Sequence, residues 1–223
     1  MVSKQLILDR LNDYCLKKEQ HRDINCITND LYDRALFNYK NFTESQTNGP
    51  LSGKLFAVKD NINIKGLPTT CASNILKTHC SIYTSTAVKK IETAGGLIVA
   101  KTNLDEFGMG SSNEYSIFGT SKNPSNLNYV CGGSSGGSAG VVSAGVVDVA
   151  LGSDTGGSIR HPAAACGTVG LKPTWGRVSR HGVLDLAQSL DHVGPLTRSA
   201  ADAGIVLQAI AGLDTNDPTT LLD

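Results

Sequence analysis

Two serines and one lysine carry the chemistry that this sequence suggests. Ser134 lies in the cluster "GGSSGGSAG", Ser158 lies in the cluster "DTGGSIR", and Lys59 follows the apolar run "LFAV". A serine nucleophile needs a neighbouring base, and a buried lysine can serve as that base because burial disfavours its charged form. Ser134 could relay the proton between the other two residues. Lys59, Ser134 and Ser158 are therefore candidate catalytic residues.

The glycines before Ser158 suggest how a negative charge on the substrate would be held. Backbone N–H groups that converge on one point form an oxyanion hole, and glycine lets a carbonyl approach them without a Cβ in the way. We expect these N–H groups to belong to Thr155, Gly156, Gly157 and Ser158.

A glycine-rich loop can also bind phosphate, but the details of this sequence argue against that function. The Walker pattern requires a lysine directly after its last glycine, and neither cluster has one. The dinucleotide pattern G-x-G-x-x-G is absent as well.

A nucleophile elbow is the second alternative, since residues 132–136 fit G-x-S-x-G. An α/β-hydrolase has an apolar strand directly before this serine, whereas "NPSNLNYVCGG" is typical of a polar loop. No feature of the sequence singles out the acid and the histidine that such a site needs from the available residues Asp185, Asp191, His181 and His192.

The flanking segments alternate between helix and strand patterns. Apolar residues at helical spacing predict helices over residues 3–17 and 27–39, with Thr28 or Asn29 as the N-cap of the second. The fold class that we expect is α/β, with a mixed central sheet covered by helices, and we place an N-terminal helical segment at 1–50 and a core at 51–223. The expected strands of the core are 54–62, 97–103 and 146–154, its expected helices are 84–96 and 199–213, and 167–179 is expected to be extended.

Composition limits the possible partners. Lysines and arginines number 20, as do aspartates and glutamates, so no basic surplus indicates direct binding to nucleic acid. No apolar run reaches the length of a membrane span, because Asp148 interrupts the best one. The six cysteines lack zinc-binding spacing, so we expect free thiols and no metal.

Taken together, "GGSSGGSAG" and "ALGSDTGGSIRHPAAACGTVGLKPTWGRVSRHG" resemble the amidase signature family. The resemblance implies a Ser, cis-Ser, Lys triad, in which Lys59 of "VKDN" is the base, Ser134 the bridging serine after a cis peptide and Ser158 the nucleophile. Ser135 is the less favoured choice for the bridging position. Asp154 and Arg160, which flank Ser158, are expected to form a structural ion pair.

Within that family, "AKTNLDEFGMGSSNEYSIFGTSKNP" and "QSLDHVGPLTRSAADAGIVLQAIAG" are similar to the ammonia-supplying subunits of tRNA-dependent amidotransferases. That similarity implies hydrolysis of glutamine and transfer of its ammonia to Glu attached to tRNA(Gln). The implied partners are the B-type amidotransferase subunit, which would bind ATP, Mg²⁺ and the tRNA, and a small third subunit of C or F type. No cofactor is expected on this chain.

The family domain is about twice as long as this chain, so the resemblance covers its N-terminal half. The resemblance implies that the residues that select glutamine lie in the C-terminal half, which this sequence does not include. A different amidase of small amides and a non-catalytic scaffold subunit are the alternative functions. The asparagine-rich N-terminal third favours a mitochondrial protein, with a bacterial cytoplasmic one as the alternative.

Overall fold

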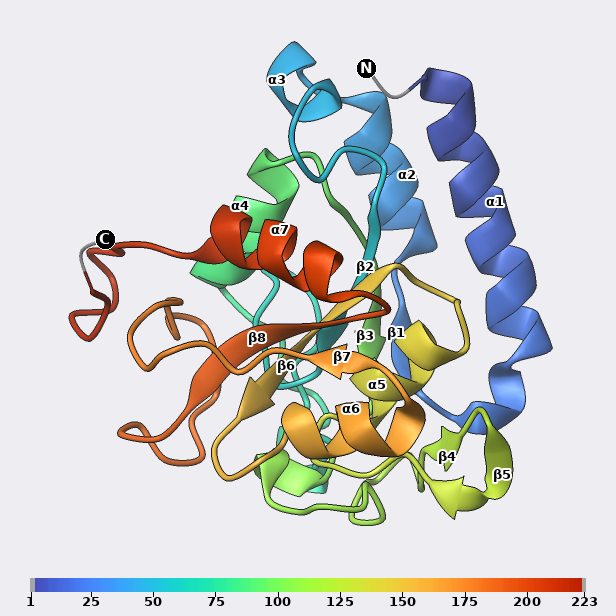
Figure 1. Cartoon of the computed structure of the whole chain (residues 1–223), viewed down its shortest axis with the longest axis vertical. Helices are drawn as coiled ribbons and strands as arrows, with labels where there is room; N and C mark the ends of the chain where they lie inside the picture. Colours follow the sequence, from blue (N-terminus) through green and yellow to red (C-terminus); the bar gives the residue numbers. More distant parts are fainter. Residues whose placement is uncertain (1–2, 222–223) are drawn as a thin grey trace.

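The centre of the molecule is a six-stranded sheet in the order β1-β3-β2-β6-β8-β7 (Figure 1). The computed structural model describes residues 3–221. Strands β3, β2 and β6 are parallel, and β1 and β8 run antiparallel to their neighbours β3 and β6. The strands are β1 (Ile27–Asp30), β2 (Leu55–Lys59), β3 (Leu97–Thr102), β6 (Val149–Asp154), β7 (Val169–Gly170) and β8 (His192–Thr197).

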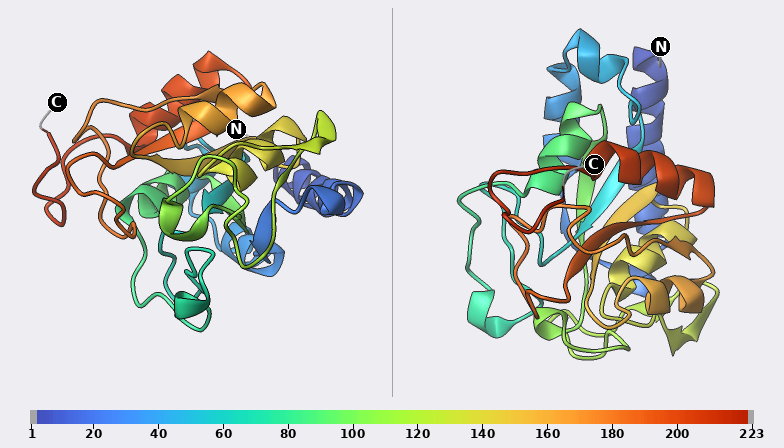
Figure 2. Two further views of the ribbon diagram at one scale, coloured as in Figure 1. Left: turned by 90° about the horizontal axis from the view of Figure 1, so that it is seen from below. Right: turned by 60° about the vertical axis from the view of Figure 1, so that its left-hand side comes forward.

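Helices cover both faces of this sheet, as Figure 2 shows from two further directions. The α-helices are α1 (Lys4–Gln20), α2 (Tyr32–Lys40), α3 (Glu44–Thr47), α4 (Thr86–Thr93), α5 (Gly136–Ser143), α6 (Arg160–Cys166) and α7 (Ala200–Ile210). Short 3-10 turns are η1 (Arg22–Ile24), η2 (Asn74–Leu76) and η3 (Glu106–Gly108). The α/β class with a mixed, helix-covered sheet is thus confirmed.

Side chains that point alternately to the two faces of the sheet divide the hydrophobic core into two clusters. On β2, Leu55 and Ala57 pack with helices α1, α2, α5 and α6, whereas Phe56 and Val58 pack with α4 and α7. Successive strand residues point to opposite faces, and all five residues of β2 are buried because both faces are covered. This burial on both sides explains why the strand contains an unbroken apolar run before Lys59.

The prediction of one helix over 27–39 is wrong at its start. Ile27–Asp30 form strand β1, which pairs with β3, and helix α2 begins only at Tyr32. Leu31 is the N-cap of that helix, and Asp30 Oδ1 accepts a hydrogen bond from the Tyr32 N–H at 3.2 Å. The polar residues 28 and 29 therefore belong to an edge strand whose pairing with β3 outweighs their preference for a helix start.

Two other segments differ from expectation. The stretch before Ser134 is an exposed antiparallel hairpin, β4 (Lys122–Asn123) and β5 (Asn126–Val130), where a polar loop was expected. Residues 167–179 contribute only the two-residue strand β7, and the longer β8 was not predicted at all. Among the helices of residues 3–221, none has the length and apolar character to span a bilayer.

Candidate active site

Lys59 reaches its position because it ends β2, beside the end of the parallel strand β6. Parallel neighbours bring their carboxyl ends to the same edge of a sheet, where sites commonly form. The fully buried Lys59 Nζ lies 2.8 Å from Ser134 Oγ and 2.9 Å from Ser153 Oγ. Ser153 Oγ also accepts a hydrogen bond from Asn61 Nδ2 at 3.0 Å. The lysine is therefore held by two hydroxyl groups.

Burial lowers the pKa of Lys59 to about 7, although the nearby carboxylates of Asp105, Asp154 and Asp191 act in the opposite direction. A lysine with this pKa is largely neutral in slightly alkaline solution and can accept a proton there. The sequence-based expectation of a desolvated lysine at the end of an apolar strand thus agrees with the geometry.

Ser134 is buried just before helix α5, and the peptide bond between Gly133 and Ser134 is cis. Gly133 fits tightly against Asp105, since a Cβ added to this glycine would lie 2.1 Å from Asp105 Oδ2. The same Oδ2 accepts a hydrogen bond from the Asn113 N–H at 2.9 Å, and burial raises the pKa of Asp105. Only glycine therefore fits between Ser134 and this carboxylate.

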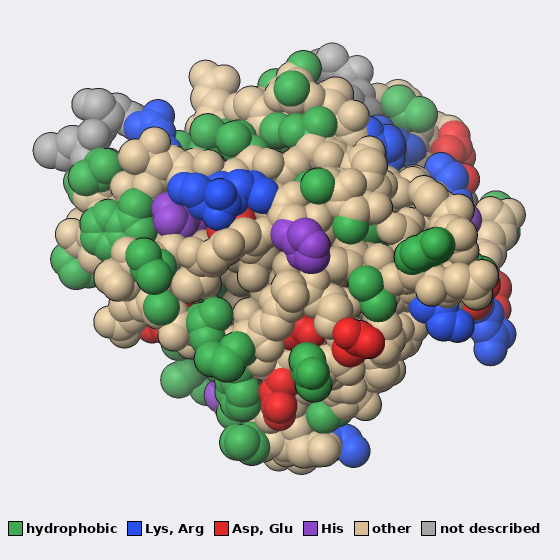
Figure 3. Space-filling model, turned by 60° about the horizontal axis from the view of Figure 1, so that its bottom comes forward, with side chains coloured by type: hydrophobic (Ala, Val, Ile, Leu, Met, Phe, Trp, Pro, Cys, Tyr) green, Lys and Arg blue, Asp and Glu red, His purple; other side chains and the backbone are tan. Residues whose placement is uncertain are grey.

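Ser158 borders a pocket of about 490 Å³ at the end of the molecule where β6 and α6 meet. Figure 3 shows this end, whose surface consists mostly of backbone and uncharged polar side chains. The two glycine-serine clusters are joined directly, because the Ser135 N–H donates to the Ser158 carbonyl at 3.1 Å. The pocket is lined by Gly108, Met109, Gly110, Ser111, Gly133, Thr155, Gly156, Gly157, Ser158, His161 and Leu186.

The N–H groups expected to form the oxyanion hole are not all available. The Gly157 N–H donates to Asp154 Oδ1 at 2.9 Å, so this member of the predicted set is already engaged. The N–H groups of Thr155, Gly156 and Ser158 have no hydrogen-bond acceptor within the described part of the chain. A Cβ added at Gly156 would meet no atom within 4 Å, so this residue borders open space.

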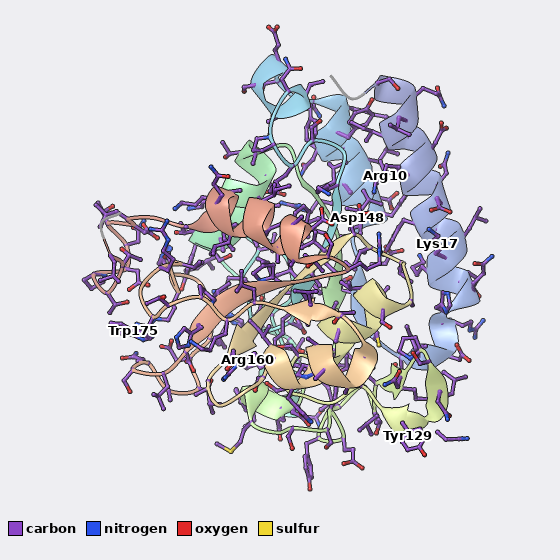
Figure 4. All side chains as sticks on the ribbon, viewed as in Figure 1. Arg10, Lys17, Tyr129, Asp148, Arg160 and Trp175 are labelled. Carbon is purple, nitrogen blue, oxygen red and sulfur yellow. The ribbon has the colours of Figure 1, made fainter. Side chains whose placement is uncertain are left out.

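Asp154 and Arg160 form the expected ion pair. Arg160 Nη2 lies 2.9 Å from Asp154 Oδ1, and Arg160 Nε donates to Oδ2 at 3.1 Å. Burial alone would raise the pKa of Asp154, but the hydrogen bonds from Arg160 hold it below its usual range. Arg160 begins helix α6 and is half exposed (Figure 4), so the pair fixes the turn that carries Ser158.

The histidines considered for a nucleophile elbow lie elsewhere. His181 stacks on Tyr83, and His192 Nδ1 lies 3.2 Å from the Asp154 carbonyl oxygen. Sequence reasoning overlooked His161, which lies one turn after Ser158 and lines the pocket, as well as Met109 and Leu186. The signal for His161 was its spacing of three residues from the serine at the start of a helix.

The fold and the pocket together define the class of protein. It is an α/β protein with a serine-lined pocket beside a buried, weakly basic lysine. The Amidase family model matches residues 9–222, and the chain belongs to this family. Curated relatives are named as the A-type subunit of glutamyl-tRNA(Gln) amidotransferase. The Lysinibacillus sphaericus protein is 59% identical over 77% of this chain and 35% of its own length. The Methanococcus maripaludis protein is 47% identical over 97% of this chain and 50% of its own length.

Solved structures extend the similarity. The crystal structure of the A-type glutamyl-tRNA(Gln) amidotransferase subunit from Thermotoga maritima is 43% identical and has a TM-score of 0.89 over all of this chain and 47% of that one. Peptide amidase from Stenotrophomonas maltophilia is 34% identical, with a TM-score of 0.87 over 96% of this chain and 46% of that one. The chain spans about half the length, or less, of the relatives it matches.

Proposed function

We propose that this chain hydrolyses glutamine as part of a tRNA-dependent amidotransferase that converts Glu-tRNA(Gln) to Gln-tRNA(Gln). The observation that carries the proposal is the contact of 2.8 Å between Lys59 Nζ and Ser134 Oγ, beside the pocket that Ser158 borders. The names of the curated relatives support the choice of substrate.

In the proposed reaction, Ser158 Oγ attacks the side-chain amide carbon of glutamine. The Ser158 proton passes to Ser134, and the Ser134 proton passes to neutral Lys59. The N–H groups of Thr155, Gly156 and Ser158 stabilise the oxyanion. Collapse of the intermediate breaks the C–N bond, the relay returns the proton to the leaving ammonia, and water then releases glutamate from the acyl-enzyme.

The rest of the proposed reaction takes place on other chains. The B-type amidotransferase subunit would bind ATP, Mg²⁺ and the tRNA, and a small C-type or F-type subunit would complete the assembly. The neutral formal charge of this chain agrees with contact to tRNA through a partner alone. We also propose a mitochondrial location, which fractionation of the source cells would test.

Ammonia release from glutamine, measured with and without the partner subunits, tests the proposal. Ser158→Ala should abolish it, and Lys59→Ala should lower it by about 10³-fold or more, because the members of a triad act as a unit. Labelling of Ser158 by an electrophilic glutamine analogue, followed by mass spectrometry, should accelerate as pH rises through about 7, where Lys59 loses its proton.

Ser135→Ala is the matched control, because Ser135 Oγ donates to the Ser153 carbonyl oxygen, and the hydrogen bonds of Lys59 within residues 3–221 go to Ser134 and Ser153. We expect this variant to stay within about tenfold of wild type. Near-normal turnover in Ser158→Ala or Lys59→Ala would refute the triad.

Hydrolysis of other small amides is the second candidate function. The observation in its favour is the TM-score of 0.87 to a peptide amidase. Ammonia release from a C-terminal peptide amide, but not from glutamine, would favour this activity. An active partner complex in which Ser158→Ala has no effect would indicate a scaffold subunit.

A further inference from the structure

Asp191 connects two segments that line the pocket but lie far apart in the sequence. Its Oδ1 accepts a hydrogen bond from Thr155 Oγ1, and its Oδ2 accepts hydrogen bonds from the Leu186 N–H at 2.9 Å and the Ala187 N–H at 3.0 Å. Thr155 and Leu186 both line the pocket. One buried carboxylate therefore contacts both the turn before Ser158 and the segment that brings Leu186 to the pocket.

Sheet geometry brings Asp191 to this place. It directly precedes β8, whose first residue His192 is the partner of Asp154 at the end of β6. Antiparallel pairing therefore sets Asp191 opposite Thr155, the first residue beyond the ladder. The position is fixed by two core strands, whereas the segments that Asp191 holds are loops.

The two carboxylate oxygens of Asp191 have different partners, and this distinguishes the contact from an ordinary loop cap. A cap of the 186–191 turn would need only Oδ2, which accepts both backbone N–H groups of that turn. The other oxygen accepts a hydrogen bond from the hydroxyl group of Thr155, which lies in the turn after β6. Three hydrogen bonds to one side chain therefore join the two segments.

We propose that Asp191 is a positioning residue that holds the backbone N–H groups of Thr155 and Gly156 in place relative to the part of the pocket lined by Leu186. The inference rests on the proposed function, in which these groups hold the oxyanion. Oxyanion donors act only when they point at the developing charge. Loss of the hydrogen bonds between Asp191 and its two segments should therefore slow acylation of Ser158 more than it weakens binding of the substrate.

The test is acylation of Ser158 in the whole chain by p-nitrophenyl acetate, a small activated ester, followed by nitrophenolate release and by the mass of the protein. Asp191→Asn and Thr155→Val should each lower the maximal rate by about tenfold, with less than about twofold change in the half-saturating ester concentration. Thr155→Ser, which keeps the hydroxyl, should restore the rate. The double variant should be no slower than either single variant, because both remove the same link.

Asp185→Asn is the matched control, since Asp185 lies in the same loop but is exposed, and within residues 3–221 its carboxylate accepts a hydrogen bond from Gln188 Nε2 alone. Its maximal rate should equal that of wild type. Equal rates for Asp191→Asn and wild type, or additive losses in the double variant, would overturn the proposal. If Asp191→Asn does not fold, the maximal acylation rate of Thr155→Val tests the proposal instead.

Failure of the proposed function is recognised separately. If wild-type Ser158 is not acylated, and Ser158→Ala behaves identically, the nucleophile assignment fails. Amide hydrogen exchange then tests the contacts of Asp191 independently of catalysis. Asp191→Asn should speed exchange at both 155–158 and 186–187, whereas Asp185→Asn should speed it at neither segment. If exchange became faster at 186–187 only, Asp191 would cap its own loop without positioning residues 155–158, and the proposal would be wrong.

Discussion

Two buried lysines on neighbouring strands show how surroundings set the role of a residue. Lys101 on β3 pairs with Asp60 at 3.0 Å and donates to the Ile62 carbonyl oxygen at 2.7 Å, so its charge is compensated. Lys59 on β2 contacts hydroxyl groups and, weakly, the Ser153 carbonyl oxygen, and no carboxylate of residues 3–221 forms an ion pair with it. An unpaired buried cation is costly, so burial lowers the pKa of Lys59 and this residue tends to be neutral. Burial lowers the pKa of Lys101 as well, but Asp60 acts in the opposite direction through its charge and a hydrogen bond.

This contrast predicts opposite effects on stability. Native Lys59 binds fewer protons than unfolded Lys59 between its lowered pKa of about 7 and the ordinary value of 10.5, so its contribution makes stability rise with pH across that interval. Lys59→Met should remove this rise and increase Tm at pH 7 by about 4 °C or more. Thermal unfolding at several pH values measures both effects.

Lys101→Met is the control, and it should lower Tm because it leaves the Asp60 carboxylate buried without its cation. A lower Tm for Lys59→Met would contradict this view of the site. The measurement does not depend on any substrate.

At the level of elements, local patterns predicted those parts that depend on local preferences. Ser199 caps helix α7 as expected, with its side chain accepting from the Asp202 N–H, and β2, β3 and β6 fall within their predicted runs. Strand β8 escaped prediction because "HVGPLT" contains Gly194 and Pro195, which are typical of turns. Its pairing with β6 places Asp191 beside Thr155, and such pairing leaves no local signal in the sequence.

The same limit applied to the turn before Ser158. The spacing of the glycines indicated an oxyanion hole, but it could not show that Asp154 accepts the Gly157 N–H. That contact depends on the conformation of the turn, which the Asp154 to Arg160 pair stabilises. Residue types were therefore predictable here, and the direction of each N–H group was not.

Gly156 provides a prediction for this element. Because its φ is not in the left-handed region and a Cβ there would meet no atom within 4 Å, Gly156→Ala should leave Tm unchanged within about 2 °C. The added methyl group would instead project into space that the substrate needs, and acylation of Ser158 should fall by about tenfold or more.

Gly204→Ala is the control for that measurement. It is also free of contacts but lies in helix α7, so the rate should not change and Tm should rise slightly, because alanine favours the helix. An unchanged acylation rate in Gly156→Ala would show that the substrate carbonyl does not approach this turn.

Across the whole molecule, the N-terminal segment and the site share one hydrophobic core. Ile7 and Leu11 of α1 belong to the same buried cluster as Ala139 of α5 and Ile159, which follows Ser158. Arg10 of α1 also pairs with Asp148 directly before β6, as Figure 4 shows. The division at residue 50 remains a prediction about sequence organisation, but these contacts lead us to expect joint unfolding on both sides of it.

Leu11→Ala tests that expectation, because Leu11 is fully buried and lies far along the chain from Ser158. Removing its side chain should lower the free energy of unfolding by about 2–4 kcal/mol. In urea, helical circular dichroism and Ser158 acylation should then be lost together, at a lower concentration than in wild type. Leu16→Ala, on the exposed side of α1 with 65% of Leu16 accessible, should match wild type. Loss of helical signal before loss of acylation would show that the N-terminal segment unfolds independently of the site.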